Sequence, residues 1–313
     1  MNTKTKQQRW NMAMERREFA RQCGALALFG LAGGLPWPLR GAETAPKTVF
    51  GSNVFGWTQY YKRDNKPFNL DEVIAALADC GYDYLENFMD VKAPENNAVL
   101  AEKLRAKGMR PVSLYVGANF HDAAKAGQTV SDLLKVCEVC RKAGFEVVSC
   151  NPQPLNREKT DEELKTQAAA LVDFGRGLKQ IGLQLGIHHH LPEMKSNGRE
   201  FHYVFRNTPP DLVGFCYDVH WVFKGGIKPE DALKEYGRRV VTWHLRQSRE
   251  GVWWEELDAG DVDYEWVARY ARENRLPRRF TVELALEAKT KITRGAVENH
   301  RRSLAYAKKI FGV

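Results

Sequence analysis

The sequence predicts an α/β fold in which an N-terminal export signal, residues 1–45, precedes a single (β/α)8 TIM barrel over residues 46–313. Apolar segments typical of strands alternate with amphipathic helical segments to the end of the chain, which indicates a parallel sheet. The 313 residues are 43% hydrophobic, and barrels of about 250 residues commonly form one domain. Several predicted strands also end in polar side chains, where barrels of this kind place their active sites.

The leader has the pattern of an export signal. Arg16 and Arg17 are followed by Phe19 and then by an apolar run over residues 23–35 that contains no acidic residue. This pattern resembles a twin-arginine signal, so we expect a periplasmic protein whose precursor meets an export machinery. A membrane-peripheral helix or a disordered tail is the alternative. We expect no stable membrane span, because the run is shorter than the about 20 residues that cross a bilayer.

The basic charge does not predict a nucleic-acid partner. The net charge is +8, but residues 1–45 contain seven Lys or Arg residues against three acidic ones and so carry about half of it. A concentrated basic groove would be needed to bind DNA or RNA. Cys137 and Cys140 have the spacing of a redox or zinc motif, but they fall within a predicted amphipathic helix, where we expect them to pack in the core.

The strand and helix segments can be placed in order along the chain. In the first half we expect strands over 48–54, 82–89, 109–116 and 145–150 and helices over 70–80, 97–107, 130–143 and 161–181. A glycine follows each of these helices and suits the left-handed backbone that ends a helix; they are Gly81, Gly108, Gly144 and Gly182. In the second half we expect strands over 183–190, 211–218, 239–244 and 279–284 and helices over 199–206, 229–236, 264–275 and 294–311.

The strand over 183–190 ends in three consecutive histidines. Alternate side chains of a strand point to opposite faces, so His188 and His190 share one face and His189 points the other way. One such histidine alone would be assigned to the surface or to the core. Three later strands, however, also end in imidazole or carboxylate groups, namely Asp218, His244 and Glu283.

Since the strands of a barrel end at one face, these side chains are predicted to converge there with Glu86 and Asn151, which end strands 82–89 and 145–150. Imidazole and carboxylate ligands suit one divalent metal ion, with Mn, Co, Zn or Fe favoured and Mg as a further option.

Five segments carry a resemblance to a known family. In order and spacing, residues 186–190, 217–222, 239–247, 260–264 and 282–283 resemble the xylose-isomerase-like barrel superfamily. That family includes tagatose 3-epimerase, hydroxypyruvate isomerase, inosose dehydratase and other sugar phosphate isomerases or epimerases. The resemblance covers about residues 48–313, and the histidine-rich strand is most similar to the one in inosose dehydratases.

The resemblance implies a ligand set and a class of reaction. The metal ligands would be His188, Asp218, His244 and Glu283, with His190 as the competitor of His188. The family often has glutamate at the position of His188, so the pair of glutamates that epimerases use is incomplete here. The resemblance therefore implies an isomerase, an epimerase or a lyase that acts on a sugar or keto-sugar through an enediolate-type intermediate.

Other polar and aromatic residues are candidates for contact with that substrate. Glu283, His190 and Glu86 are the candidate catalytic groups. A small carbohydrate is the expected partner, and the residues predicted to bind it are Trp57, Asn151, His220, Trp221 and Arg246. Core packing or a salt bridge is the alternative for Trp57, Arg246 and Glu86.

Two other functions are compatible with the sequence. One is a non-catalytic sugar-binding or accessory barrel in the periplasm. The other is a nuclease-like repair function, which the low charge of the barrel segment disfavours. The sequence makes no prediction of the oligomeric state.

Overall fold

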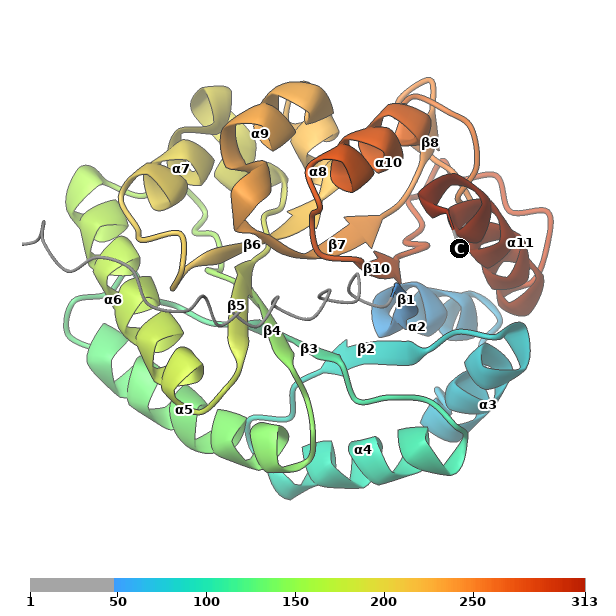
Figure 1. Ribbon diagram of the computed structural model, residues 1–313, viewed down its shortest axis with the longest axis horizontal. Helices are drawn as coiled ribbons and strands as arrows, with labels where there is room; N and C mark the ends of the chain where they lie inside the picture. The colour runs from blue at the N-terminus through green and yellow to red at the C-terminus, as the bar shows by residue number, and fades with distance from the viewer. Residues whose placement is uncertain (1–47, 313) are drawn as a thin grey trace, which may run out of the picture. The chain divides into compact units, whose positions relative to one another are not determined.

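The computed structural model describes residues 48–312. The export signal predicted over residues 1–45 lies outside this part of the chain and stays a prediction. The described residues form a barrel surrounded by helices (Figure 1). None of the described helices is both long and apolar enough to cross a membrane.

Eight parallel strands close the barrel in the order β1-β10-β7-β6-β5-β4-β3-β2, and each pairs in parallel with its neighbours. Their bounds are Val49–Asn53 for β1, Tyr84–Phe88 for β2, Ser113–Gly117 for β3, Val147–Asn151 for β4, Gln184–Ile187 for β5, Gly214–Asp218 for β6, Val240–Leu245 for β7 and Arg279–Val282 for β10. The predicted (β/α)8 TIM barrel is therefore confirmed.

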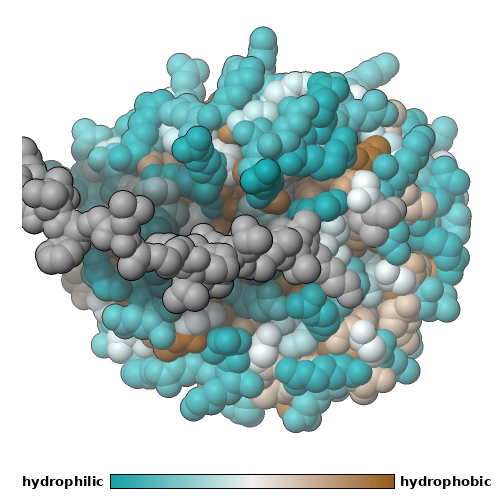
Figure 2. Space-filling view, viewed as in Figure 1, coloured by the Kyte–Doolittle hydropathy of each residue, from teal (hydrophilic) through white to brown (hydrophobic). Residues whose placement is uncertain are grey.

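Helices follow the strands and cover the outside of the barrel (Figure 1). They are α3 (Leu70–Cys80), α4 (Glu95–Ala106), α5 (Ala126–Lys142), α6 (Asp161–Gln180), α7 (Lys195–Arg206), α9 (Pro229–Tyr236), α10 (Tyr264–Glu273) and α11 (Ala296–Phe311). The face of the molecule seen in this view is mainly hydrophilic where it is not covered (Figure 2). Cys137 and Cys140 are buried in α5, as expected.

The four predicted glycine caps adopt the left-handed backbone, with φ angles of +89° at Gly81, +73° at Gly108, +97° at Gly144 and +82° at Gly182. An L-residue with a Cβ atom is strained at such angles. These glycines end the helices and return the chain to the next strand.

The strand predicted over residues 183–190 extends further at its C-terminal end than the strand in the structure. Strand β5 stops at Ile187, and the three histidines follow it. The backbone N–H of His190 donates to the Glu193 carboxylate at 2.9 Å, and the chain turns there into a short 3-10 helix, η1 (Leu191–Met194). The histidines therefore belong to a loop that is fixed by side-chain contacts.

Short elements directly after the strands were not predicted. They are the helices α2 (Val54–Arg63) and α8 (Val219–Lys224) and a two-stranded sheet of β8 (Ser248–Arg249) and β9 (Val252–Trp253). Helix α8 is only six residues long, too short to show a helical period. The Asp218 carboxylate begins it by accepting from the Trp221 N–H at 2.7 Å.

Candidate metal centre

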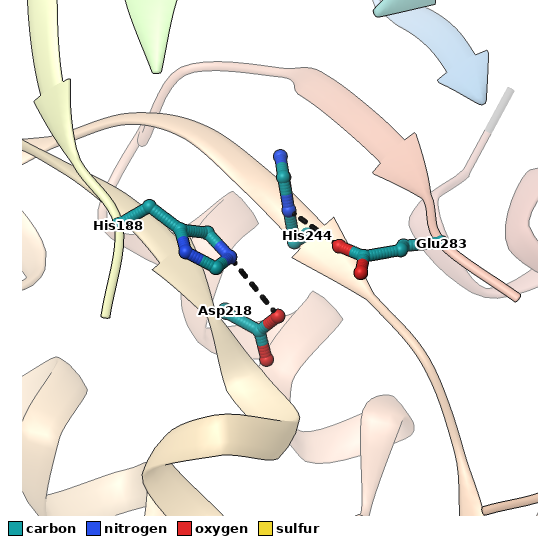
Figure 3. A group of neighbouring side chains, drawn as sticks. All are labelled: His188, Asp218, His244 and Glu283. Carbon is teal, nitrogen blue, oxygen red and sulfur yellow. Dashed lines mark hydrogen bonds and ion pairs between the residues drawn. The ribbon is translucent and has the colours of Figure 1, made fainter. Parts of the chain in front are cut away.

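Four side chains from four strand ends converge at the mouth of the barrel (Figure 3). Asp218 ends β6, His244 lies near the end of β7, and His188 and Glu283 directly follow β5 and β10. Each offers one ligand atom, these atoms all lie within 4.8 Å of one another, and all four residues are buried. The structure thus brings together the four residues predicted as metal ligands.

The contacts within this group leave His188 unsatisfied. Nδ1 of His244 lies 2.8 Å from Oε2 of Glu283, and Nε2 of His188 lies 3.4 Å from Oδ2 of Asp218. Neither nitrogen of His188 has a hydrogen-bond partner among residues 48–312, although the residue is only 1% exposed. Buried polar groups of this kind normally have partners. Two imidazoles and two carboxylates also form a donor set that a divalent first-row metal accepts, so these residues fit such an ion.

Glu86 lies beneath His244 and is completely buried. Its carboxylate accepts from the hydroxyls of Ser113 at 2.5 Å and Ser149 at 2.8 Å and from the Asn53 amide at 2.9 Å. Nε2 of His244 lies 2.7 Å from Oε1 of Glu86, although the contact lacks the geometry of a hydrogen bond. Burial alone would raise the pKa of Glu86, but His244 and the two hydroxyls outweigh it and lower this pKa to about 2.

This placement bears on the prediction that Glu86 acts directly on a substrate. The Glu86 carboxylate favours a proton on Nε2 of His244, and Nδ1, which lies 2.8 Å from Oε2 of Glu283, would give up its own proton when a metal ion binds there. Histidines that bind metals commonly have such a carboxylate on the far nitrogen. Glu86 is therefore placed to orient His244, and its direct action on a substrate stays a prediction.

Arg246 extends the group of charges. Its guanidinium donates to Oδ2 of Asp218 at 2.6 Å and lies 3.5 Å from Oε1 of Glu283. It also lies over the rings of Trp221 and Trp253, at 5.1 and 4.5 Å from their centroids. Burial would raise the pKa values of Asp218 and Glu283, but Arg246 and the neighbouring histidines lower both.

His190 lies at the side of the group, with its ring 4.7 Å from that of His188 and 5.6 Å from that of Trp221. Burial, helped by the charge of His188, lowers the pKa of His190 to about 3, so its imidazole is neutral near pH 7. His189 points the other way, as predicted, and packs against the rings of Phe201, Phe205 and Phe215.

Asn151 and Glu193 hold the histidine loop in place. The Asn151 amide donates to the backbone oxygen of His188 at 3.1 Å and to Glu193 at 3.2 Å. The same Glu193 carboxylate accepts from the backbone of His190. Asn151 is thus engaged with the protein, and its contact with a substrate stays a prediction.

The other predicted substrate contacts lie at different depths. Trp221 is partly exposed beside His190, where a ligand can reach it. Trp57 is 3% exposed and stacks on His300 with ring centroids 4.2 Å apart, so the structure does not bring it to the group. His220 is fully buried and packs near Trp253.

Tyr115 was missed by the sequence analysis. It lies on β3 two residues after Ser113, on the same face of the strand, and its ring centroid is 5.4 Å from that of His188. It is partly exposed. The strand period alone could have identified it, since it faces the barrel interior near the end of a predicted strand.

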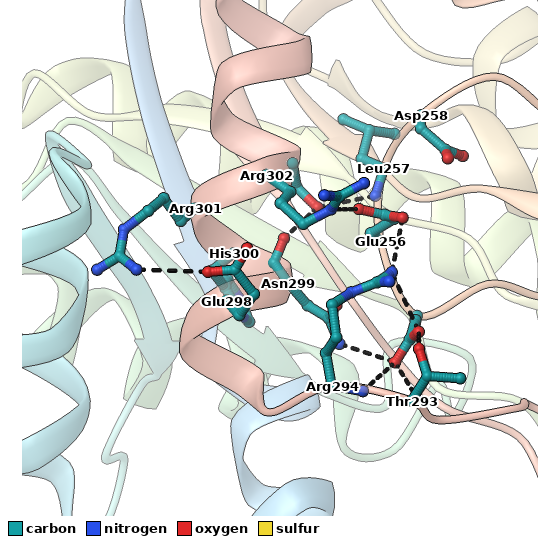
Figure 4. Close-up of polar contacts among 12 residues, drawn as sticks. Glu256, Leu257, Asp258, Thr293, Arg294, Glu298, Asn299, His300, Arg301 and Arg302 are labelled. Carbon is teal, nitrogen blue, oxygen red and sulfur yellow. Dashed lines mark hydrogen bonds and ion pairs between the residues drawn. The ribbon is translucent and has the colours of Figure 1, made fainter.

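The segment that follows β9 contacts α11 and the residues before α11 (Figure 4). Glu256 accepts from Arg294 at 2.7 Å and from Arg302 at 2.5 Å. Glu255 accepts from the backbone N–H groups of Thr293 at 2.8 Å and Arg294 at 3.1 Å. These contacts join the β7–α10 loop to the β10–α11 loop at the mouth of the barrel.

Comparison with known proteins gives consistent matches. A sequence model of the family described as "Xylose isomerase-like TIM barrel" matches residues 74–310. An inosose dehydratase of Mesomycoplasma hyopneumoniae strain J is 26% identical over 194 residues, which cover 58% of this chain and 63% of that relative. The chain therefore matches less than two thirds of the length of this curated relative.

Solved structures share the fold. A sugar phosphate isomerase/epimerase from Parabacteroides distasonis superposes with a TM-score of 0.67 at 20% identity, covering 85% of this chain and 94% of that one. The IolI protein with a bound zinc atom superposes with a TM-score of 0.66 at 17% identity, covering 84% and 98%. At these identities the likeness shows the fold alone.

Proposed function

The chain belongs to the xylose isomerase-like TIM barrel family, and from this premise we propose that it is a metal-dependent enzyme acting on a sugar or keto-sugar. The reaction would be an isomerisation, an epimerisation or an elimination at a carbon next to a carbonyl group. The observation that carries the proposal is the buried group of His188, Asp218, His244 and Glu283, whose ligand atoms all lie within 4.8 Å of one another.

The four residues would hold one divalent ion, with Mn, Co, Zn or Fe as the candidates. Such an ion supplies Lewis acidity that polarises a carbonyl and makes the neighbouring C–H more acidic. The IolI structure with bound zinc is similar in fold, which supports a metal of this kind here. Metal dependence and the identity of the ion belong to the proposal.

His190 would remove the proton. Its ring lies 4.7 Å from that of His188 and 5.6 Å from that of Trp221, and imidazole is the most common general base in enzymes. Burial lowers the pKa of His190, which keeps the imidazole unprotonated near pH 7 and makes it a weaker base than an exposed histidine. Trp221 lies beside it and would contact the apolar face of a sugar ring. Glu283, 10% exposed on its side chain, would combine metal binding with a second proton-transfer role.

Elimination is the first reaction to assay, because the curated relatives are named inosose dehydratases. The structural neighbours named as sugar isomerases and epimerases support the alternatives. Export to the periplasm is a further part of the proposal and rests on the pattern around Arg16 and Arg17.

The test measures exchange of the substrate C–H with solvent deuterium by NMR, using inososes and keto-sugars in D2O with Mn2+ present. His190→Ala should slow exchange by about 100-fold or more, the usual contribution of a general base, and should keep its metal. His188→Ala should lose both metal and exchange. His202→Ala, a half-buried histidine on α7, is the control and should keep both.

Full exchange in His190→Ala would remove that residue from the mechanism. Tight sugar binding by the wild type without any exchange or conversion would instead support the non-catalytic sugar-binding function.

A further inference from the structure

Arg246 is a buried cation among candidate metal ligands. It is 2% exposed, and its guanidinium contacts Oδ2 of Asp218 at 2.6 Å and approaches Oε1 of Glu283 at 3.5 Å. Oδ2 of Asp218 is also the oxygen nearest to His188. Arg246 therefore uses the same carboxylate oxygen that faces the ligand group.

Arg246 brings a permanent positive charge to two of the carboxylates of the group, Asp218 and Glu283. Glu86, Asp218 and Glu283 contribute three negative charges within a buried region. One divalent ion with neutral imidazoles would leave one negative charge uncompensated, and Arg246 supplies the missing positive charge. Unbalanced buried charge is costly, so this balance favours a single divalent ion in the group.

Both the guanidinium and the backbone of Arg246 are held by neighbouring side chains. The guanidinium lies over Trp221 and Trp253, in positions suited to cation–π contacts. The hydroxyl of Tyr264 contacts both the backbone N–H of Arg246 at 3.0 Å and its backbone oxygen at 2.6 Å. Trp253 itself lies on the loop fixed through Glu255 and Glu256. These contacts oppose movement of Arg246 away from the two carboxylates.

We propose that Arg246 is a resident cation that shares Asp218 and Glu283 with the metal ion. It is a positioning residue: it holds the two carboxylates side by side before metal binds and completes the charge balance afterwards. The inference rests on the proposed metal dependence, and it adds that the site is built for one divalent ion plus one fixed guanidinium.

Thermal unfolding in chelator and in excess Mn2+ tests the inference, with wild type compared with Arg246→Met. Without Arg246 the two carboxylates repel each other in chelator, so the variant should unfold at a clearly lower temperature than wild type. Mn2+ should recover most of this loss. The metal-induced rise in the unfolding temperature should then be about twice that of wild type, since the ion now offsets repulsion that Arg246 had removed.

Arg249→Met is the matched control. Arg249 also lies over a tryptophan, Trp254, at 4.0 Å and pairs with Asp258, but it is outside the ligand group and its side chain is 43% exposed. Its replacement should leave the metal-induced rise in the unfolding temperature equal to that of wild type.

Two further variants separate the effect of the charge from that of the side-chain shape. They also keep the test usable if Arg246→Met does not fold. Arg246→Lys keeps the charge and should show the wild-type rise, whereas Arg246→Gln keeps a donor without charge and should show the enlarged rise. Equal behaviour of the Lys and Gln variants would overturn the inference. The inference would also be overturned if the metal-induced rise in the unfolding temperature of Arg246→Met or Arg246→Gln were equal to or smaller than that of wild type. Absence of any metal-induced rise in the wild type would instead contradict the proposed function.

Discussion

At the scale of single residues, the imidazole of His244 lies between two carboxylates of different depth. Glu283 faces Nδ1 at the mouth, and Glu86 faces Nε2 from below. The hydroxyls of Ser113 and Ser149 hold Glu86 in turn. Glu86 and Glu283 therefore contact His244 from its two ring nitrogens, and both bear on its orientation.

Glu86→Gln should weaken metal binding about 10- to 100-fold, the usual effect of losing a carboxylate behind a metal-binding histidine. The amide keeps the shape of the side chain but no longer stabilises a proton on Nε2 of His244. Isothermal titration with Mn2+ or Zn2+ measures the change. Glu138→Gln, on an exposed position of α5, is the control. Unchanged affinity in Glu86→Gln would show that Glu86 does not orient the ligand.

The sequence predicted which residues gather, but not what Glu86 does among them. His188, Asp218, His244 and Glu283 were found because each stands at the end of a recognisable strand. The partner of Glu86, His244, is 158 positions away, and only the closed barrel brings the two together. The distance between their side chains is not encoded in any local pattern.

At the scale of elements, the strands were predictable and the loops after them were not. Residues 70–80 and 229–236 were predicted with the bounds that α3 and α9 have. By contrast, α8, β8 and β9 are shorter than the periods that reveal helices and strands. They are fixed by side-chain contacts such as the Asp218 cap and the contacts of Glu255 and Glu256.

Glu255→Gln should lower the free energy of unfolding by about 1–3 kcal/mol, because three donors lose a buried charged acceptor. Those donors are the backbone N–H groups of Thr293 and Arg294 and the Asn299 amide. Urea denaturation measures the loss, with Glu250→Gln on an exposed turn as the control. A loss of less than about 0.5 kcal/mol, the range of ordinary surface substitutions, would contradict the assigned importance of this contact.

At the scale of the whole molecule, closure of the barrel creates the site. Its eight strands are contributed by segments spread over residues 49–282, yet their ends meet at one mouth. Alternation of strands and helices was enough to predict this closure, because parallel strands joined by helices form few architectures. The depth of each side chain, such as the burial of Trp57 against His300, depends on packing between distant segments and was not predictable.

The most direct test of the metal centre is the metal content of the purified barrel, residues 46–313, measured by elemental analysis after exposure to Mn2+, Co2+ and Zn2+ and removal of free metal. We expect about one divalent ion per chain, lost in His188→Ala and retained in His190→Ala. Wild-type protein that retains no ion, or a His188→Ala variant that retains it fully, would contradict the assignment of this group as a metal centre.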